Sequence, residues 1–416
     1  MKPNYFYFLT VLFFILTSCE RETGEFKTVN VVTAKTMTIK DFRSSVDIVS
    51  PRPIEESGKI YAYKNLVLVN DMDKGIHIIN NRNPKNPVKI AFINIVANRD
   101  MEIRGNYLYA DSLMDLLVFD IGDLDNIKLV ARLTDVLQRY IPFPFLEDAV
   151  YENYNYHADE IVVGYDVTQE RRRIEELNNS VWREGDDMLM STNSTTATTT
   201  GQGGSLARFK IVDNMLYAVD SHNINIFNIE NMAQPVRLES IFAGFDIETI
   251  FNRGNHLFLG SMRGMYIYDI ENPALPQLVS EFEHGTACDP VVVDEDYAFI
   301  TLRAGNACGA LESSLEIVDI SDIVHPKLVK TYPMDNPYGL GINANLLFIC
   351  DGTSGLKVYD KTNVEDLKMV NHFKDIQTYD VIPLRRHLLM IGDKILYQYK
   401  YKDNSIDLLS KFSLSE

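Results

Sequence analysis

The feature that most constrains this chain is a phrase of about forty residues that recurs along it. In each copy, a strand-like run of alternating apolar residues ends at a polar residue, which enters a turn rich in Asn, Asp and Pro. These polar residues are spaced by 40, 108, 41, 50, 41 and 40 positions. They are Asn80, Asp120, Asn228, Asp269, Asp319, Asp360 and a degenerate copy at Lys400. A chain that repeats itself at this period folds as an array of one small unit.

Each repeat unit contains four predicted strands. Two short apolar runs joined by a tight turn precede the alternating strand, as in Pro290–Val293 and Tyr297–Ile300, and a shorter run follows it, as in Lys327–Tyr332. Four antiparallel strands in about 40–50 residues match one blade of a β-propeller. A β-sandwich has no reason to repeat the whole phrase, and an open solenoid would need capping units, which are not evident in the sequence.

Counting the units gives the predicted fold. We expect an all-β, seven-bladed β-propeller of four-stranded antiparallel blades over residues 37–416. Ring closure is open, because either the residues near 40–50 or those after 412 could pair with a terminal blade. The predicted blades cover roughly 58–93, 98–133, 206–242, 245–282, 286–332, 335–373 and 375–412.

Several phrases carry a family resemblance. Leu315–Asp319 and its copies resemble the LVIVD repeat of bacterial and archaeal cell-surface proteins, and Asn106–Ser112 and Leu347–Gly352 look like phrases of the Bacteroidetes lipoproteins in that family. The resemblance covers nearly all of the chain after about residue 37. It implies a propeller at the cell surface. It implies no established activity or active-site residues.

The N-terminus has the pattern of a lipoprotein signal peptide over residues 1–18. A basic residue is followed by an apolar stretch that is too short for a comfortable membrane span, and Leu16–Cys19 has the shape of a lipobox. We expect cleavage before Cys19, acylation of its thiol by palmitate, and a polar tether over residues 19–36. The alternative is an uncleaved anchor or an ordinary signal. The acylated protein would lie on the bacterial envelope, at the outer membrane, facing the surface or the periplasm.

The net charge of −18 narrows the classes of ligand. A strongly acidic chain repels nucleic acid and anionic lipid, so no nucleic-acid partner is expected. The charge favours cations, basic partners or neutral glycans, although ordinary solubility explains it equally simply.

Three cysteines remain beyond the lipobox. Cys288 begins the innermost strand of the fifth blade, and Cys308 lies in the loop after the second strand of that blade. Both positions fall on one face of the ring, so we expect a Cys288–Cys308 disulfide, which an exported protein permits. Cys350 alternates with Phe348 in an apolar strand and is expected to be a buried free thiol.

One long insertion, about residues 134–205, separates blades 2 and 3 on the face that carries the channel entrance. Ile161–Val167 is a predicted strand, and residues 168–204 are expected to be a disordered loop because they are charged and then rich in Ser, Thr and Gly. The insertion begins with an aromatic section that could grip a protein or glycan partner, or else pack onto the propeller. Its rings are Tyr140, Phe143, Phe145, Tyr151, Tyr154 and Tyr156.

Polar residues near the starts of innermost strands are candidates for a site at the channel mouth. They are Asp100, Asp246, Asp289, Asp380 and Tyr338. Converging carboxylates there could hold Ca²⁺, the one cofactor considered. The alternative is that they accept hydrogen bonds from backbone N–H groups in the connections between blades.

The catalytic motifs sought in the sequence are not found. There is no zinc-binding His pair of the His-Glu-x-x-His type, no Gly-x-Ser-x-Gly and no phosphate-binding Gly loop. We therefore expect a non-catalytic binding or scaffolding propeller. The alternative is a propeller enzyme, such as a glycan lyase or hydrolase or a lactonase, with Arg99 and His284 beside the residues at the channel mouth.

Overall fold

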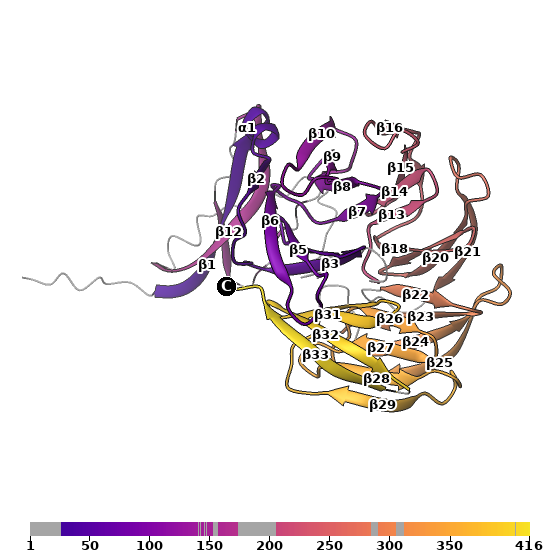
Figure 1. Cartoon of the computed structure of the whole chain (residues 1–416). Helices are drawn as coiled ribbons and strands as arrows, with labels where there is room; N and C mark the ends of the chain where they lie inside the picture. The colour runs from indigo at the N-terminus through magenta and orange to yellow at the C-terminus, as the bar shows by residue number, and fades with distance from the viewer. Residues whose placement is uncertain are drawn as a thin grey trace, which may run out of the picture.

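The computed structural model describes residues 26–139, 141, 143–144, 146, 148–152, 157–173, 205–283, 290–304, 312–403 and 405–416. Apart from the short helix α1 (Ile39–Ser44), every helix or strand of this part is a β-strand. No helix among these residues has the length and apolar character needed to cross a bilayer. The strands form antiparallel sheets of four or five strands arranged around a centre, together with one three-stranded sheet at the side (Figure 1).

Each sheet of the array is built from one uninterrupted run of the chain, in which four successive strands lead from the innermost position to the rim. In the first sheet one further strand precedes these four and lies outside the fourth. The first three runs are β2 (Asp47–Val49), β3 (Ser57–Tyr63), β4 (Leu66–Asp71), β5 (Gly75–Asn80) and β6 (Val88–Asn94); β7 (Met101–Arg104), β8 (Tyr107–Ser112), β9 (Asp115–Asp120) and β10 (Lys128–Leu133); and β13 (Phe209–Val212), β14 (Met215–Val219), β15 (Asn223–Asn228), β16 (Val236–Arg237) and β17 (Ile241–Phe242).

The remaining four runs follow the same plan. They are β18 (Ile247–Arg253), β19 (His256–Ser261), β20 (Gly264–Asp269) and β21 (Gln277–Glu283); β22 (Val291–Asp294), β23 (Tyr297–Leu302), β24 (Ser314–Asp319) and β25 (Lys327–Pro333); β26 (Leu340–Asn343), β27 (Leu346–Cys350), β28 (Leu356–Asp360) and β29 (Lys368–Phe373); and β30 (Asp380–Pro383), β31 (His387–Gly392), β32 (Ile395–Lys402) and β33 (Ser405–Ser413).

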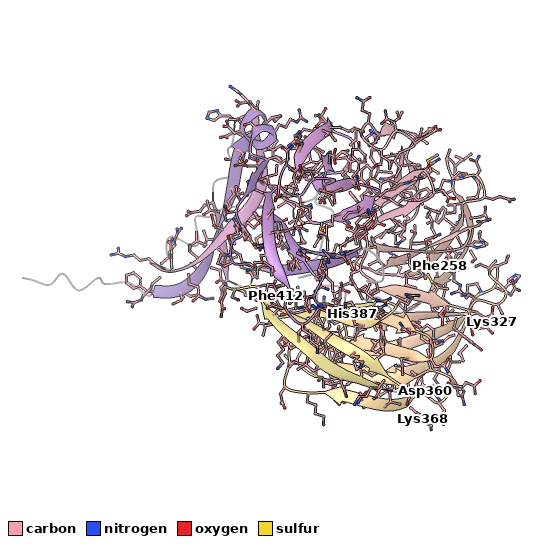
Figure 2. All side chains as sticks on the ribbon, viewed as in Figure 1. Phe258, Lys327, Asp360, Lys368, His387 and Phe412 are labelled. Carbon is pink, nitrogen blue, oxygen red and sulfur yellow. The ribbon has the colours of Figure 1, made fainter. Side chains whose placement is uncertain are left out.

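The recurring polar residue of the repeat does what the sequence predicts. At the end of the third strand its side-chain oxygen accepts a hydrogen bond from the backbone N–H two residues on, in Asn80, Asp120, Asn228, Asp269, Asp319 and Asp360, at 2.8–3.0 Å. The turn then returns the chain as the fourth strand, so that Asp360 and Lys368 lie opposite each other at the periphery (Figure 2). The repeated phrase is therefore a turn signal placed after a buried strand.

The sheets are arranged in a cycle. Their innermost strands contact one another in the order β3, β7, β13, β18, β22, β26, β30 and back to β3. Apolar clusters fill the space between neighbouring sheets, as where Ile60 and Val69 of the first sheet pack with Ile382 and Leu389 of the last. The expected all-β, propeller-like arrangement is confirmed at this level.

The two ends of the array meet without sharing a strand in the described part of the chain. The N–H of Ile54 donates to the carbonyl of Leu414 at 2.8 Å, and the side-chain amides of Asn81 and Gln398 form two hydrogen bonds with each other. The yellow C-terminal sheet accordingly lies beside the purple strands of the first sheet in Figure 1. Residues 47–49 pair only with β6, as an additional outer strand. Packing and backbone contacts thus join the ends, rather than the strand pairing that the sequence left open.

The expected polar tether is shorter than residues 19–36. Residues 26–38 form β1 (Phe26–Thr38), which pairs with β11 (Ala149–Glu152) and β12 (Glu160–Arg173) of the insertion. Alternating valines drive this pairing, because Val29 and Val31 are buried together with Val150. Residues 37–44 likewise belong to β1 and α1 and not to a blade.

The insertion is partly as expected. The strand predicted at Ile161–Val167 is confirmed within β12, but β12 continues to Arg173, so residues 168–173 are not part of a disordered loop. Arg172 lies in this extension and pairs with Glu152 of β11 at 2.6 Å. Residues 1–25, which include Cys19 and the signal peptide, and residues 174–204 lie outside the described residues.

Candidate functional site

We call the side of the ring that carries the connections between sheets the connection face. Because neighbouring strands are antiparallel, the starts of innermost strands and the loops between second and third strands lie on this side. A carboxylate at the end of a second strand recurs there and accepts the N–H groups of two residues that lead into the same sheet, at 2.7–3.2 Å. The sets are Asp71 with Glu55 and Glu56, Asp111 with Arg99 and Asp100, and Asp351 with Asp335 and Asn336.

Asp100 acts in the same way between two sheets. Its carboxylate accepts the N–H groups of Arg208 at 2.7 Å and Phe209 at 2.9 Å, where the third sheet begins. The side chain is 1% exposed and forms an ion pair with Lys59 of the first sheet. Of the two roles that the sequence left open, Asp100 therefore has the structural one, as an acceptor for backbone donors.

The innermost strands also enclose a cluster of ionisable groups around Lys59. Burial lowers the pKa of Lys59 despite the attraction of Asp100, and it raises the pKa of Asp100 to about 6. Burial raises the pKa of Glu102 to about 7, against the opposing effect of Lys210, and raises the pKa of Asp380 well above its ordinary value. These side chains are at most 5% exposed, so they form part of the wall and are not open to a substrate.

The predicted channel-mouth aspartates do not meet at an open site, and the two that come near each other, Asp100 and Asp380, lie in the buried cluster around Lys59. Asp100 and Asp380 are buried in the wall, whereas Asp246 is partly exposed and pairs with Arg263 at 3.2 Å. Asp289 lies outside the described residues. Within the described ranges, no three His, Cys, Asp or Glu side chains are placed to hold a metal ion.

The end of the insertion crosses the centre of the connection face. Ser205 Oγ accepts the N–H of Leu340 at 2.9 Å, and the carbonyl of Ala207 accepts the N–H of Ile250 at 2.5 Å. Leu340 belongs to β26, which is not a neighbour of β13 in the cycle of contacts, so the segment spans the centre. Ser205, Leu206 and Ala207 are all buried there.

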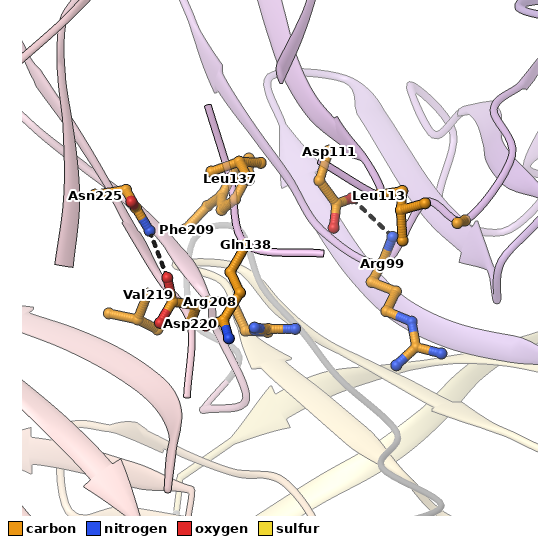
Figure 3. Close-up of a pocket in the computed structure, with 11 residues that line it drawn as sticks. Arg99, Asp111, Leu113, Leu137, Gln138, Arg208, Phe209, Val219, Asp220 and Asn225 are labelled. Atoms are coloured by element: carbon orange, nitrogen blue, oxygen red, sulfur yellow. Dashed lines mark hydrogen bonds between the residues drawn. The ribbon is translucent and has the colours of Figure 1, made fainter. Parts of the chain in front are cut away.

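A small cavity lies where the second and third sheets meet (Figure 3). Its walls include Arg99, Arg208 and Asp220, and its volume is about 30 Å³. Arg99 is held by two hydrogen bonds of 2.9 Å to Asp73, and Asp220 accepts from Asn225 at 2.9 Å. A cavity of this size has room for water but not for an organic ligand.

Tyr338, one of the predicted channel-mouth candidates, precedes β26 on the connection face and lines a larger cavity of about 180 Å³. Its ring meets the Tyr379 ring edge to face, with centroids 5.4 Å apart, and the Arg303 guanidinium lies 4.2 Å from the Tyr338 centroid. Tyr379 was not among the predicted site residues. It could have been found, because it precedes an innermost strand at the position equivalent to Tyr338.

An exposed apolar surface lies elsewhere, in what we call the rim groove, between the outer parts of the third and fourth sheets. The groove has a volume of about 420 Å³. Phe242, Phe245, Leu275 and Leu278 line it and are 48–59% exposed. Gly244 has φ +139°, and a Cβ atom there would lie 2.6 Å from the Tyr266 ring. Glycine therefore allows the backbone to pass close to this ring in the groove.

Aromatic contacts shape the rim groove. Phe242 and Phe245 meet edge to face at 5.4 Å, and His222 packs against both rings. Arg263, which pairs with Asp246, lies with its guanidinium 5.2 Å from the Phe245 centroid, beside the groove, and Glu281 lines the groove. In the sequence these residues look like ordinary strand residues, because their exposure depends on where the neighbouring sheet lies, and the site was therefore not predicted.

The described aromatics of the insertion contact one another. Phe143 stacks on Tyr151 at 5.0 Å and meets Tyr165 edge to face at 5.3 Å, while the Tyr151 hydroxyl donates to the carbonyl of Pro144. These contacts hold Phe143 and Tyr151 against other residues of the insertion itself. Their predicted companions Tyr140, Phe145, Tyr154 and Tyr156 lie outside the described residues.

Cys350 is a buried free thiol, as predicted, and burial raises its pKa well above the ordinary value. The predicted disulfide partners, Cys288 and Cys308, lie outside the described residues, as does His284. The structure therefore leaves that disulfide a prediction.

Comparisons with known proteins agree on the fold. The model of the LVIVD repeat matches residues 97–135 and 284–333. A protein from Lactobacillus plantarum is similar in structure, with 9% identity, coverage of 85% of this chain and 94% of that chain, and a TM-score of 0.55. BamB from Moraxella catarrhalis has 6% identity, coverage of 90% and 99%, and a TM-score of 0.50. The dihydro-heme d1 dehydrogenase NirN has 12% identity, coverage of 88% and 67%, and a TM-score of 0.50.

No curated protein matches the chain in sequence. At such low identity, the structural similarities establish the fold alone. Together with the matched repeats, they support a repeat β-propeller.

Proposed function

We propose that this chain is a lipid-anchored protein of the bacterial envelope, of the Bacteroidetes lipoprotein type, whose propeller binds a partner protein and performs no catalysis. The single observation that carries the binding role is the rim groove with its four half-exposed apolar side chains. The anchor rests on the lipobox at Leu16–Cys19, and the outer membrane is the proposed location.

We take the array to be a closed ring of seven blades with one long insertion between blades 2 and 3. Seven sheets of four or five strands among the described residues and the cyclic contacts of their innermost strands support this count. A closed ring is rigid, which keeps a groove between two blades preformed for its partner.

An apolar segment of a partner polypeptide suits the rim groove. Burying a Phe or Leu side chain fully stabilises a complex by about 1.5–3 kcal/mol, and aromatic residues in such grooves dominate binding. Arg263 at the edge provides a donor for a carbonyl or carboxylate of the bound segment.

The competing function, a propeller enzyme, receives less support. An enzyme needs His, Arg, Tyr or carboxylate side chains converging in a pocket that a substrate can enter. The groups that do converge, Lys59, Asp100 and Glu102, are enclosed by the innermost strands and engaged with one another or with the backbone.

Photo-crosslinking in cells tests the binding role. A photoreactive phenylalanine analogue replaces Leu278 of β21 or, as a matched control, Leu408 of β33, which occupies the equivalent place in another outer strand and is similarly exposed. We expect a discrete protein adduct at position 278 that Phe242→Ser abolishes, and none at 408. Equal adducts at both positions, or none at 278, would contradict the proposal.

The anchor is tested separately. Cys19→Ala should abolish incorporation of an alkyne-labelled palmitate, because it removes the thiol that would carry the acyl chain. Unchanged labelling of the variant would exclude this thiol as the acylated group.

A further inference from the structure

The structure holds a second site, distinct from the rim groove. We propose that the cavity beside Tyr338 and Tyr379 binds a neutral sugar ring. We call it the tyrosine cavity. It lies on the connection face and is lined by Glu56, Ser57, Tyr338, Tyr379, Asp393 and Lys394, among others.

Segments far apart in the sequence build the tyrosine cavity. Ser57 begins β3 of the first sheet, Tyr338 precedes β26, Tyr379 precedes β30, and Asp393 lies in the loop between β31 and β32. Three of these positions are equivalent ones in the repeat, directly at or before an innermost strand. The cavity is thus a product of the ring and cannot form within any one sheet. Its volume of about 180 Å³ is well below that of a typical drug-sized site, which suits one small ring.

The walls of the cavity are aromatic. The Tyr338 and Tyr379 rings are half-buried and perpendicular to each other, at 5.4 Å between centroids. Burial raises the pKa of Tyr379, with the carboxylates of Asp393 and Glu56 adding to this, so its hydroxyl remains protonated and able to donate at neutral pH. Tyrosine offers an apolar ring together with a polar tip, which suits the apolar C–H face and the hydroxyl rim of a sugar.

A buried hydroxyl in the wall points to a bound polar ligand. Ser57 is 8% exposed, and its Oγ has no hydrogen-bond partner among the described residues. Leaving such a group unsatisfied costs about 1–3 kcal/mol. A ligand hydroxyl can both donate to and accept from Oγ, and would remove this penalty.

Charge decides the class of ligand. Glu55, Glu56 and Asp393 line the cavity together with Lys394, and Glu55 is already paired with Arg52 and Lys74. A cationic ligand is disfavoured, because it would meet the ammonium group of Lys394 and because the Arg303 guanidinium already lies against the Tyr338 ring. An anionic ligand is disfavoured by Glu56 and Asp393. A neutral ligand with many hydroxyls suits both kinds of charged group, because its hydroxyls donate to the carboxylates and accept from the ammonium group.

Sugar binding can be measured on the purified full-length protein by saturation-transfer NMR and titration. The probes are glucose, galactose, mannose and N-acetylglucosamine at up to about 10 mM, a range that detects millimolar dissociation constants. Tetramethylammonium and inorganic phosphate serve as charged comparison ligands. The variants are Ser57→Ala and Asp393→Asn in the cavity, and Asp403→Asn, an exposed residue between β32 and β33, as the matched control.

We expect saturable binding of at least one sugar and none of either charged probe. Ser57→Ala and Asp393→Asn should each weaken sugar binding by roughly two- to tenfold, the effect of one lost hydrogen bond. Ser57→Ala should leave the melting temperature unchanged or higher, because it removes an unsatisfied hydroxyl, whereas a purely structural serine would give a lower one. Asp403→Asn should bind like the wild type.

Three results would overturn the proposal: no sugar of the panel binds, a charged probe binds in its place, or both cavity variants bind sugar as tightly as the wild type. These outcomes are independent of the crosslinking at position 278, so the two proposals can fail separately.

Discussion

Single carboxylates hold the entrances of the sheets in place. Asp351 accepts two backbone N–H groups and pairs with the nearly buried Lys357. Asp351→Ala leaves these donors without their acceptor and should destabilise the protein by roughly 2–4 kcal/mol, measured from the midpoint of urea unfolding. The control is Asp407→Ala, which removes an exposed pair with Lys402 and should cost less than about 1 kcal/mol. Equal losses for the two variants would show that burial of the carboxylate is immaterial.

The carboxyl of Glu102 makes the stability of the folded protein depend on pH. Its pKa is about 7 in the fold and 4.5 in the free side chain, so the folded protein binds this proton more tightly than the unfolded chain. Stability from this group is therefore fully present below about pH 4.5 and is lost as the pH rises through 7. Glu102→Gln should raise stability at pH 8 by roughly 1–3 kcal/mol and leave it nearly unchanged at pH 4.5, in parallel thermal melts. Exposed Glu365→Gln should reproduce the wild-type profile at both values.

Within one sheet, glycine at the start of the third strand permits a close approach to the end of the fourth. A Cβ atom on Gly75, Gly264 or Gly355 would lie 1.9–2.0 Å from a carbonyl oxygen of the neighbouring strand, and all three have positive φ. Gly355→Ala should cost about 2–4 kcal/mol, because backbone must move. Gly254 also has positive φ, but a Cβ atom there would have no atom within 4 Å. Gly254→Ala should therefore cost only about 1–2 kcal/mol of stability. If chemical denaturation gave the same loss for both, the close contact would have no energetic role.

Strands could be predicted where one face is buried and a turn residue ends the run, which is why the third strands and their Asp or Asn turns were found. Pairing between distant segments could not be predicted. The alternation at Val29 and Val31 is visible in the sequence, yet their partner Val150 lies in another segment with only four paired residues. The rim groove could not be predicted for the same reason, since the exposure of Phe242 depends on how the next sheet lies against it.

At the scale of the whole molecule, the ring closes through packing of the first sheet on the last. Leu414 is fully buried in the apolar cluster between them and accepts the N–H of Ile54. Leu414→Ala should lower stability by about 2–5 kcal/mol, the usual range for a leucine cavity. Leu408→Ala on the same sheet, which is 46% exposed, should cost far less in the same thermal melt. A variant of Leu414 that melts like the wild type would show that the ring closes by other contacts.

The antiparallel four-stranded unit could be predicted from the repeat, but the way in which the ends meet could not, because it depends on residues outside the repeat such as Ile54 and Leu414. The same holds for the candidate sites. Asp100 and Asp380 were placed correctly at innermost strands, but whether a carboxylate there faces solvent or backbone is decided by neighbouring sheets. Tyr338 was among the predicted candidates and precedes an innermost strand, whereas nothing in the sequence shows that the hydroxyl of Ser57 lacks a hydrogen-bond partner among the described residues.

Every sheet of the array comes from one unbroken run of chain, and the ends meet without exchanging a strand. A gene segment of about forty codons therefore encodes a whole structural unit. Unequal recombination between two copies would add or delete one intact unit and would not leave a half-built sheet at the junction. Rings of different size can arise from such an ancestor in a single genetic event, with only the packing angle between units left for later substitutions to adjust.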